Sequence, residues 1–581
     1  MERKISEEVA PRLILGVHDG HNAAAALLSG GKVLDVLQEE RVKRVKNIGG
    51  FPGSALEDVV RRHQIPYSNM KVVYDGTYIN YRSFSKENII HEYENCKTFK
   101  ASLRAMLKRN KPILSLYKAY KNHDRRKIVK DLFGNAKAEK IETVDHHMAH
   151  AAAAYYGWSK EGKNLILTCD GSGDGLCATV NIGDKGKFER IAQITEDNSI
   201  GRLYAYISYS LGMMPLEHEY KIMGLAPYGG VSRDVERLDK KFNSLFEFEK
   251  GLDGITWKRK NNVPSMYAPR HFVNRLIYRE RFDWIAAGLQ VFIERFLKQW
   301  VSNCIKAVGI KKVALSGGVF MNVKANKAIY EIPEVEELFV FPSCGDESNS
   351  IGAAYYAFMK NGGDNVEPLK AIYFGSDITD EDVEHDIEHH KFKGKRRITY
   401  KQNIEKSVAE LLAKGEVVGR IKGKMEFGAR ALGNRSILAN ASNHNIIKII
   451  NEMIKRRDFW MPFAPSVLAE ASECYFIKPK PLLSPYMMFT FDTKPEKREK
   501  IIATLHPHDY TARPQEVIED WNPEYYRLIK YYEDITGEPI ILNTSYNLHG
   551  YPIVYTPSDA LEVFDNSGLA YLALGNYLLK K

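Results

Sequence analysis

The sequence predicts an α/β protein built from two domains. A chain of 581 residues is too long for one ordinary domain, and its hydrophobic fraction of 44% is typical of a folded protein. Apolar strands alternate with helices along the first half, and several strands end in glycine or aspartate beside a helix start. Turns of this kind form the ligand-binding edge of nucleotide-binding α/β folds.

The N-terminal elements follow a repeated order. We expect a strand over residues 13–17 and a β-hairpin over 23–42 that turns at a Ser-Gly-Gly sequence. Residues 164–184 repeat this arrangement, because an apolar strand ends at aspartate and glycine and a second strand follows. Residues 311–329 and 337–359 each predict a strand, a turn and then a helix.

A break near residue 361 predicts the domain boundary. The segment NGGDNVEP interrupts the preceding helix there, so we expect one domain over residues 1–370 and a second over 380–581. Within the second, the pattern predicts a helix and strand over 406–421 and strands over 486–493 and 538–545.

Composition narrows the functional classes. The six cysteines form no C-x-x-C pair, so a zinc ribbon is not expected, and their scatter fits reduced thiols in the cytoplasm. No apolar run approaches the roughly 20 residues of a membrane helix, and the N-terminus lacks the features of a signal peptide. The net charge is +10, but the densest basic stretch, residues 97–130, carries no RNA-binding motif. We expect this stretch to be a solvated helical face, and we expect neither a nucleic acid nor a membrane partner.

Two histidines and two aspartates predict a metal site. His146 and His150 are four residues apart in an alanine-rich helical segment, so they share one helical face and can reach one ion. Asp170 and Asp346 each end an apolar strand beside glycines. Such a set suits iron, manganese or zinc. The alternatives are a solvent-facing histidine pair and aspartates that cap helices or turns.

Three further features of the first domain predict contacts with reactants. Gly317 and Gly318 follow a strand, and Asn322 comes one turn into the next helix, so backbone N–H groups there could receive a phosphate. His21 follows the first strand and could accept a proton from a hydroxyl. Lys46 could meet an anionic intermediate. A plain tight turn, a turn histidine and a solvated basic loop are the alternatives.

The second domain carries basic residues in several separated segments, each beside glycines, prolines or aromatic residues. Guanidinium groups in such loops suit bidentate phosphate contacts, which predicts a polyanionic ligand such as a nucleotide. The alternative is solvated surface charge. The candidate ligand-binding residues are Arg430, Lys455, Arg457, Arg513, Ser545 and Asn547.

Together these segments resemble a known family. The blocks GVHDGHNAAAAL, DHHMAHAAAA, KIMGLAPYG, SGGVFMN, MEFGARALGNRSILA, PFAPSVL, TARPQ and LNTSYNLHGYPIV resemble, in the same order, those of the NodU/CmcH O-carbamoyltransferases. The resemblance covers nearly the whole chain. It implies an N-terminal actin-like ATPase (ASKHA) domain, similar to the tRNA threonylcarbamoyl-transfer protein, and a C-terminal YrdC-like α/β domain.

The resemblance also implies the chemistry. A YrdC-like domain would form carbamoyl adenylate from carbamoyl phosphate and ATP with its Mg²⁺, using the K-x-R and S-x-N pairs Lys455, Arg457, Ser545 and Asn547. The N-terminal domain would pass the carbamoyl group to a hydroxyl at a metal centre, with Fe²⁺ held by His146, His150, Asp170 and Asp346. His21 and Asp170 would act at the reacting groups, and Lys46 near the adenylate. Met461 departs from the family pattern, which often has Arg at this position.

The acceptor implied by the resemblance is a hydroxyl of a small molecule or saccharide, and the oligomeric state stays open. Three alternatives share parts of the pattern. A tRNA threonylcarbamoyl-type enzyme would need an RNA-binding surface. A hydrogenase-maturation carbamoyltransferase would carry C-x-x-C pairs, which are lacking in this sequence. A non-catalytic nucleotide-binding protein would need no metal ligands beside its phosphate-binding set.

Overall fold

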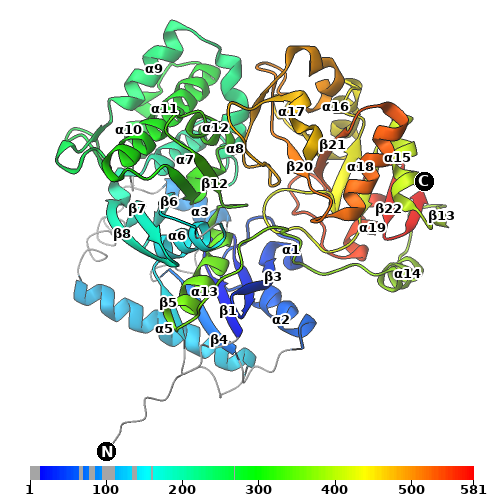
Figure 1. Ribbon diagram of the computed structural model, residues 1–581, viewed down its shortest axis with the longest axis horizontal. Helices are drawn as coiled ribbons and strands as arrows, with labels where there is room; N and C mark the ends of the chain where they lie inside the picture. The colour runs from blue at the N-terminus through cyan, green and yellow to red at the C-terminus, as the bar shows by residue number, and fades with distance from the viewer. Residues whose placement is uncertain are drawn as a thin grey trace, which may run out of the picture.

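The structure is a computed structural model of residues 1–581, described here for residues 13–64, 70–76, 86–94, 111–133, 141–158, 161–266 and 269–581. Elements up to α13 (Asn349–Lys360) lie on one side of the molecule, and those from α14 (Asp380–His389) onward lie on the other (Figure 1). Among the described residues, no helix is both long and apolar enough to span a membrane.

The N-terminal half contains two five-stranded sheets with the same topology. Each consists of an antiparallel meander of three strands whose first strand also pairs in parallel with a fourth, and the fourth with a fifth. The strand orders are β3-β2-β1-β4-β5 and β8-β7-β6-β11-β12. This duplication confirms the repeated arrangement that the sequence predicts.

The strands β1, β2, β3, β6, β7, β11 and β12 lie in the segments that the sequence predicts, whereas β4, β5 and β8 were not predicted. Their bounds are β1 (Leu13–His18), β2 (Ala24–Ser29), β3 (Lys32–Gln38), β4 (Met70–Asp75), β5 (Glu142–Val144), β6 (Asn164–Gly173), β7 (Leu176–Asp184), β8 (Lys187–Thr195), β11 (Lys312–Ser316) and β12 (Glu337–Val340).

Two buried helices cross between the sheets. Helix α6 (His146–Tyr156) packs on β6 and β11, and α13 packs on β1, β2 and β4. They approach closely because α13 carries Gly352, where a Cβ would lie 1.9 Å from the carbonyl oxygen of Ala149. Gly16 of β1 permits the same approach to the backbone of Ser350. Because these contacts lie near the first residues of α6 and α13, the starts of both helices are held close together between the two sheets.

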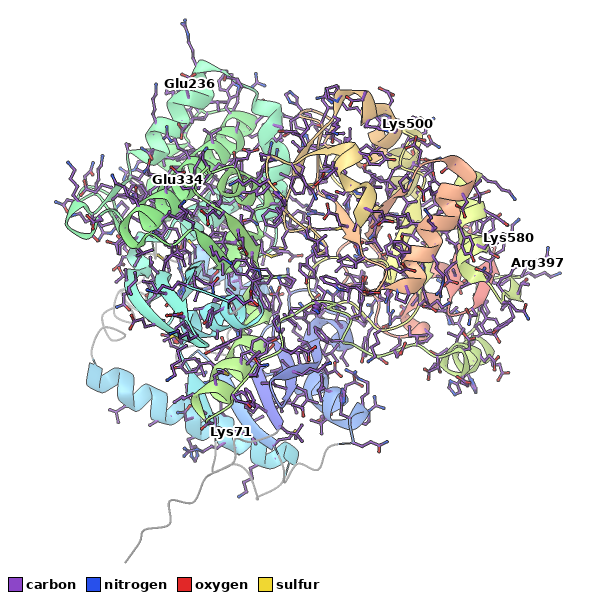
Figure 2. All side chains as sticks on the ribbon, in the orientation of Figure 1. Lys71, Glu236, Glu334, Arg397, Lys500 and Lys580 are labelled. Carbon is purple, nitrogen blue, oxygen red and sulfur yellow. The ribbon has the colours of Figure 1, made fainter. Side chains whose placement is uncertain are left out.

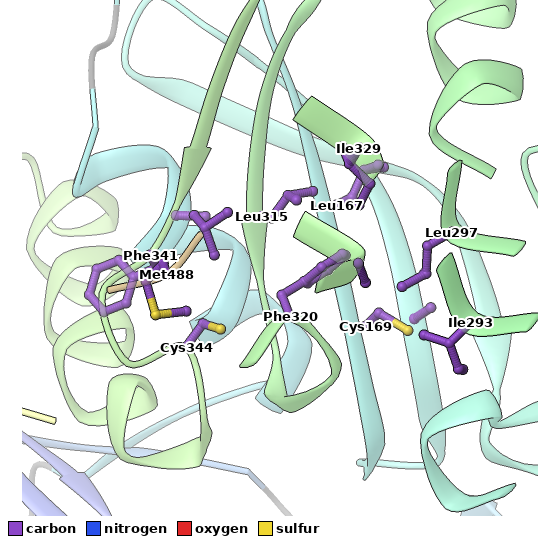
Figure 3. Packing of buried hydrophobic residues seen from close by; sticks show 14 of the residues in the cluster. Leu167, Cys169, Ile293, Leu297, Leu315, Phe320, Ile329, Phe341, Cys344 and Met488 are labelled. Atoms are coloured by element: carbon purple, nitrogen blue, oxygen red, sulfur yellow. The ribbon is translucent and has the colours of Figure 1, made fainter. Parts of the chain in front are cut away.

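The remaining N-terminal helices divide between the two sheets. Those beside the first sheet include α1 (Glu39–Lys43), α2 (Gly53–Arg62) and α5 (Lys111–Phe133). Helix α7 (Ile200–Ser210) packs on the second sheet, and on the same side of the half lie α8 (Glu219–Leu225), α9 (Arg233–Asn243), α11 (Phe282–Val308) and α12 (Val323–Tyr330). Helix α11 packs on α8, α9 and α12. Leu297 and Ile293 of α11 lie beside Leu167 and Phe320 in the apolar core (Figure 3).

The C-terminal half contains an eight-stranded mixed sheet of order β13-β23-β22-β14-β15-β21-β16-β20. Helices α15 and α18 cover one face, and α16 and α19 share the apolar cluster of the other. Arg397 and Lys580 project outward from β13 and β23 at the edge of this sheet (Figure 2). Charged residues on an edge strand discourage pairing with another chain.

The bounds of these elements are β13 (Arg397–Tyr400), α15 (Ile404–Ala413), β14 (Val418–Ile421), β15 (Arg435–Ala439), α16 (Asn445–Ile450), β16 (Ala464–Leu468), β20 (Gln515–Val517), α18 (Pro523–Thr536), β21 (Ile540–Ser545), α19 (Pro557–Asp565), β22 (Tyr571–Leu574) and β23 (Tyr577–Lys580).

The two halves share one apolar core. Met488, which belongs to the C-terminal half, is buried beside Phe341 and Cys344 of the N-terminal half (Figure 3). Its carbonyl oxygen accepts a 2.8 Å hydrogen bond from Nδ2 of Asn326. The relative position of the halves is thus fixed by apolar packing and by buried hydrogen bonds.

Two sequence predictions need correction. The predicted strand over residues 486–493 is shorter and begins only at Phe491, as β18 (Phe491–Thr493), because the methionines before it pack into the shared core. The basic stretch 97–130 is not wholly a solvated face. Its residues 97–110 lie outside the described residues, and in α5 the guanidinium of Arg125 is buried against Asp19 with N–O distances of 2.6 and 2.8 Å.

Candidate functional site

The four predicted metal ligands meet at the junction of the two sheets. His146 and His150 come from the first turn and a half of α6, Asp170 from β6, and Asp346 from the turn before α13. One ligand atom of each lies within 4.8 Å of those of the others. Both imidazoles are buried, whereas the Asp346 side chain is 21% exposed, so the cluster opens on its carboxylate side.

The tautomer of His150 can be deduced from its neighbours. The hydroxyl of Ser348 donates to the carbonyl of Gly345, so its oxygen is left to accept from Nδ1 of His150 at 3.4 Å. Ser316 Oγ lies 3.1 Å from the same Nδ1. Nε2 is therefore the unprotonated nitrogen. It is buried, has no hydrogen-bond partner and lies 3.6 Å from Asp346 Oδ1, as expected for a nitrogen that binds a metal.

His146 is oriented in the same way. Its Nε2 lies 3.3 Å from Asp170 Oδ2, and its Nδ1 lies 3.5 Å from Oδ2 of the buried Asp75. Asn349 Nδ2 is 3.3 Å from that Nδ1. Carboxylates placed behind a histidine fix the ring and increase its basicity as a ligand.

Glycines make room for these side chains. A Cβ at Gly173 would lie 2.0 Å from the ring of His146, and one at Gly318 would lie 2.7 Å from Asp170 Oδ1. The N–H of Gly318 donates to that same oxygen at 3.2 Å. Gly317 has a φ of 109°, and its N–H donates to the carbonyl of Cys344. Because these N–H groups already bond within the protein, a phosphate contact at this turn stays a prediction.

Asn322 occupies a different place from the one predicted. It is the N-cap of α12 instead of lying one turn inside the helix, and its Oδ1 accepts from the N–H of Ala325. The amides of Asn322 and Gln290 also exchange hydrogen bonds of 2.9 and 3.0 Å. The preference of asparagine for caps explains the difference.

The loop after β1 places His21 beside the cluster. His18 donates from Nε2 to the carbonyl of His21 and contacts Asp75 through Nδ1, both at 2.8 Å. Burial acts to lower the pKa of His18, but the Asp75 carboxylate outweighs it and raises the pKa to about 9. Burial lowers the pKa of His21 itself, with Asp346 and Asp170 opposing the shift. His21 is therefore suited to be a neutral proton acceptor.

In the C-terminal half, the predicted K-x-R and S-x-N residues come together. Lys455 ends a π-helical turn, η9 (Asn451–Lys455), and its Nζ bonds to Asn547 Oδ1 at 2.7 Å and to Ser545 Oγ at 3.1 Å. Ser545 Oγ donates to Asn547 Oδ1 at 2.7 Å. Burial lowers the pKa of Lys455 well below its ordinary value, with further lowering by Arg457 and Lys46.

Three arginines extend this group: Arg457 acts on Lys455, and Arg430 and Arg513 lie close enough to repel Arg457 or each other. Burial lowers the pKa of Arg457 to about 10, and burial together with Arg430 and Arg457 lowers that of Arg513 well below its usual range. Nε of Arg430 and Nε of Arg513 are buried without a partner. Burial and mutual repulsion make this group of positive charges unfavourable in the absence of a ligand, and a polyanionic ligand would neutralise them.

The two clusters adjoin at the interface between the halves. Lys46, from the N-terminal half, lies 3.3 Å from Glu217 and 5.8 Å from the ring centroid of Tyr220, and its charge lowers the pKa of Lys455. Tyr220 and Glu347 in turn oppose the lowering of the pKa of Arg430 that burial causes.

Direct contacts agree with this adjacency of the two clusters. The N–H of Ala429, beside Arg430, donates to Ser343 Oγ at 3.1 Å. Ser343 bonds to Glu347, the residue after Asp346, so the basic cluster and the His–Asp cluster lie close together.

Met461 contributes packing at this interface. Its Sδ would lie 2.9 Å from a Cβ at Gly224 of α8. Of the two basic residues that could take the place of an arginine at this position, Arg456 is exposed, and Lys424 lines a separate cavity of about 540 Å³.

Sequence reasoning missed two polar residues of the metal cluster, His18 and Asp75. Each ends a buried strand, which was the one available signal, and the parallel pairing of β1 with β4 brings them together. Arg435, by contrast, lies in a predicted phosphate-binding loop but is fully buried. It donates to the carbonyls of Gly423, Asn434 and Ser376, so it stabilises the loop.

Comparison with known proteins decides the family. The family model for the carbamoyltransferase N-terminus matches residues 13–355, and that for the carbamoyltransferase C-terminus matches residues 409–581. The chain belongs to the carbamoyltransferase family. This membership confirms the predicted resemblance and the prediction of a carbamoyltransferase enzyme.

Individual relatives extend over nearly the whole carbamoyltransferase chain. The nodulation protein NolNO of Sinorhizobium fredii is 31% identical over 572 residues, which cover 97% of this chain and 79% of the relative. An uncharacterized protein of Methanocaldococcus jannaschii is 31% identical over 572 residues, which cover 98% and 100%. Among solved structures, nucleotide- and phosphate-bound full-length HypF matches at 14% identity with a TM-score of 0.35, covering 62% of this chain and 57% of that one.

Proposed function

We propose that this carbamoyltransferase forms carbamoyl adenylate at its basic cluster and transfers the carbamoyl group to a hydroxyl at its His–Asp cluster. The observation that carries the proposal is the adjacency of two different sites, one built for a polyanion and one for a metal. The duplicated sheet topology supports an actin-like N-terminal domain over residues 1–370. The separate eight-stranded sheet supports a YrdC-like domain over 380–581.

The first step needs a site for several negative charges. Water would release phosphate from carbamoyl phosphate, and an oxygen of the resulting carbamate would attack the α-phosphorus of ATP, bound with Mg²⁺, and expel pyrophosphate. Lys455, Arg457, Arg430 and Arg513 would neutralise the reacting phosphates. Preorganised contacts of this kind contribute about 3–4 kcal/mol each.

The second step needs a nucleophile and a stabilised leaving group. The acceptor oxygen would attack the carbamoyl carbon, its proton would move to a ring nitrogen of His21, and AMP would leave. His146, His150, Asp170 and Asp346 would hold a divalent cation, for which we propose Fe²⁺. When bound, the cation would supply Lewis-acid stabilisation of the phosphate end of the adenylate.

The acceptor class follows from the relatives. Because several are nodulation proteins, we propose a saccharide or hydroxylated small molecule as the acceptor. A panel of such compounds, incubated with the protein, carbamoyl phosphate and ATP, should include one that gains the mass of a carbamoyl group.

Release of pyrophosphate tests the first step. The purified protein should release pyrophosphate from ATP only when carbamoyl phosphate is present. Lys455→Ala should slow this release by about 10²–10³-fold, since it removes a charge from the phosphate site. Lys448→Ala, which removes an exposed lysine from the preceding helix, is the matched control and should leave the rate unchanged. Equal rates in the two variants would refute the assignment of the C-terminal site.

A further inference from the structure

The loop that carries Arg430 is held on its N-terminal side by the other half of the protein. The N–H of Ala429 donates to Ser343 Oγ at 3.1 Å, and the carbonyl of Gly428 accepts from Nη2 of Arg41 at 2.6 Å. Gly428 has a φ of 97°, and a Cβ there would lie 2.4 Å from Cβ of Ser343. Two consecutive residues before Arg430 are thus fixed by side chains of the N-terminal half.

On its C-terminal side, the same loop is held from within its own half. Glu426 Oε1 accepts from the N–H of Leu432 at 2.7 Å and from that of Arg435 at 3.2 Å. The position of Arg430 relative to the His–Asp cluster therefore depends on the contacts made by Ser343 and Arg41.

Ser343 continues the connection toward the His–Asp cluster. Its hydroxyl donates to Glu347 Oε1, and Glu347 Oε2 lies 3.5 Å from Nδ2 of Asn22, the residue after His21. Ser343 and Glu347 are only 5% and 3% exposed. A hydrogen-bonded chain, Ala429–Ser343–Glu347–Asn22, with its two middle side chains buried, thus joins the loop before Arg430 to the loop that carries His21.

Two residues of this chain have an unusual backbone conformation. Ser343 has a φ of 54° and Asn22 a φ of 59°, conformations that side-chain-bearing residues seldom adopt. Such residues persist where the surroundings determine them strongly, and they gather at functional sites. A serine that accepts one hydrogen bond and donates the other fixes both loops at once.

We propose that Ser343 and Glu347 are positioning residues that keep the two reaction sites in register, so that the adenylate made at one is consumed at the other. This inference rests on the proposed two-step function. If these contacts were lost and the two sites shifted relative to each other, water would attack the carbamoyl carbon in place of the acceptor. AMP would leave, and the resulting carbamic acid would decompose to carbon dioxide and ammonia. The consequence would be release of pyrophosphate without formation of carbamoylated acceptor.

The ratio of pyrophosphate to carbamoylated acceptor measures this coupling. It should be close to one for the wild-type protein with an acceptor identified from the panel, and at least about threefold higher for Ser343→Ala. Glu347→Gln keeps the shape of the side chain and should raise the ratio in the same direction. Ser208→Ala removes a buried hydroxyl that donates to the carbonyl of Tyr204 within α7, and it should leave the ratio at one.

Each result is decisive. A ratio of one in both Ser343→Ala and Glu347→Gln, with the rates of pyrophosphate release and of carbamoyl transfer reduced together, would overturn the positioning role. Loss of pyrophosphate release alone would overturn it too. Thermal unfolding of the variants separates these results from misfolding, and Glu347→Gln decides the matter should Ser343→Ala not fold. Absence of pyrophosphate release from the wild-type protein would refute the two-step function itself.

Discussion

Gly173 lies so close to His146 that a Cβ added to it would stand 2.0 Å from Cδ2 of the imidazole ring. The ring occupies the space of the missing side chain, and His146 keeps its Nε2 directed at Asp170 only because position 173 is glycine. The metal cluster therefore depends on the close approach of the β6 backbone as well as on its four side chains.

Gly173→Ala should displace the His146 ring and lower metal affinity by at least about tenfold, the scale of losses caused by disturbing a ligand's surroundings. Metal content after dialysis, measured by elemental analysis, would report the loss. Gly171→Ala is the matched control, because a Cβ there meets nothing within 4 Å. Equal metal content in the two variants would contradict the described position of His146.

Arg125→Leu should destabilise the N-terminal half by about 3–5 kcal/mol, because it leaves Asp19 buried without its partner. The exposed neighbour supplies the control, since Arg126→Leu changes the same kind of side chain in the same helix and should shift stability by less than about 0.5 kcal/mol. Thermal unfolding compares the two. Coincident transitions would show that the Arg125–Asp19 pair does not stabilise the fold.

Stability should also depend on pH through Glu219, whose pKa is raised by burial to about 7 from an ordinary 4.5. Between these values the folded protein binds more protons at this group than the unfolded chain, so the free energy of unfolding falls as pH rises through the window. Glu219→Gln removes the titrating group and should abolish up to about 3 kcal/mol of this fall.

Urea unfolding at pH 4.5 and pH 7 measures the difference for Glu219→Gln. The exposed Glu236→Gln serves as the comparison and should retain the wild-type pH dependence. The same fall in stability for all three proteins would mean that Glu219 titrates normally.

The sequence was sufficient for most strands of the two N-terminal sheets and for the choice of the four metal-ligand candidates, for local reasons. His146 and His150 share a helical face, and Asp170 and Asp346 follow apolar strands, so each could be recognised from its own segment. The meeting of these segments follows from the repeated strand pattern. Lys455, Ser545 and Asn547 were recognised by resemblance, and their contacts are consistent with it.

What escaped prediction depends on contacts between distant segments. Asp75 acquires its role only because β1 and β4 are neighbours, and its place at the end of a buried strand does not reveal which strand lies beside it. Arg125 looked like one more charge in a basic helix, since helical periodicity does not reveal which residue of another segment it meets. Ser343 lies in a turn whose importance comes from a loop 86 residues later in the chain.

The most direct test of the account is the metal content and the two half-reactions of His150→Ala, measured on one preparation. The account predicts about one divalent ion for each wild-type chain. It predicts less than about a tenth of that for the variant, which should still release pyrophosphate from ATP and carbamoyl phosphate but should no longer carbamoylate an acceptor. Full metal occupancy in the variant, or unchanged carbamoyl transfer, would contradict it.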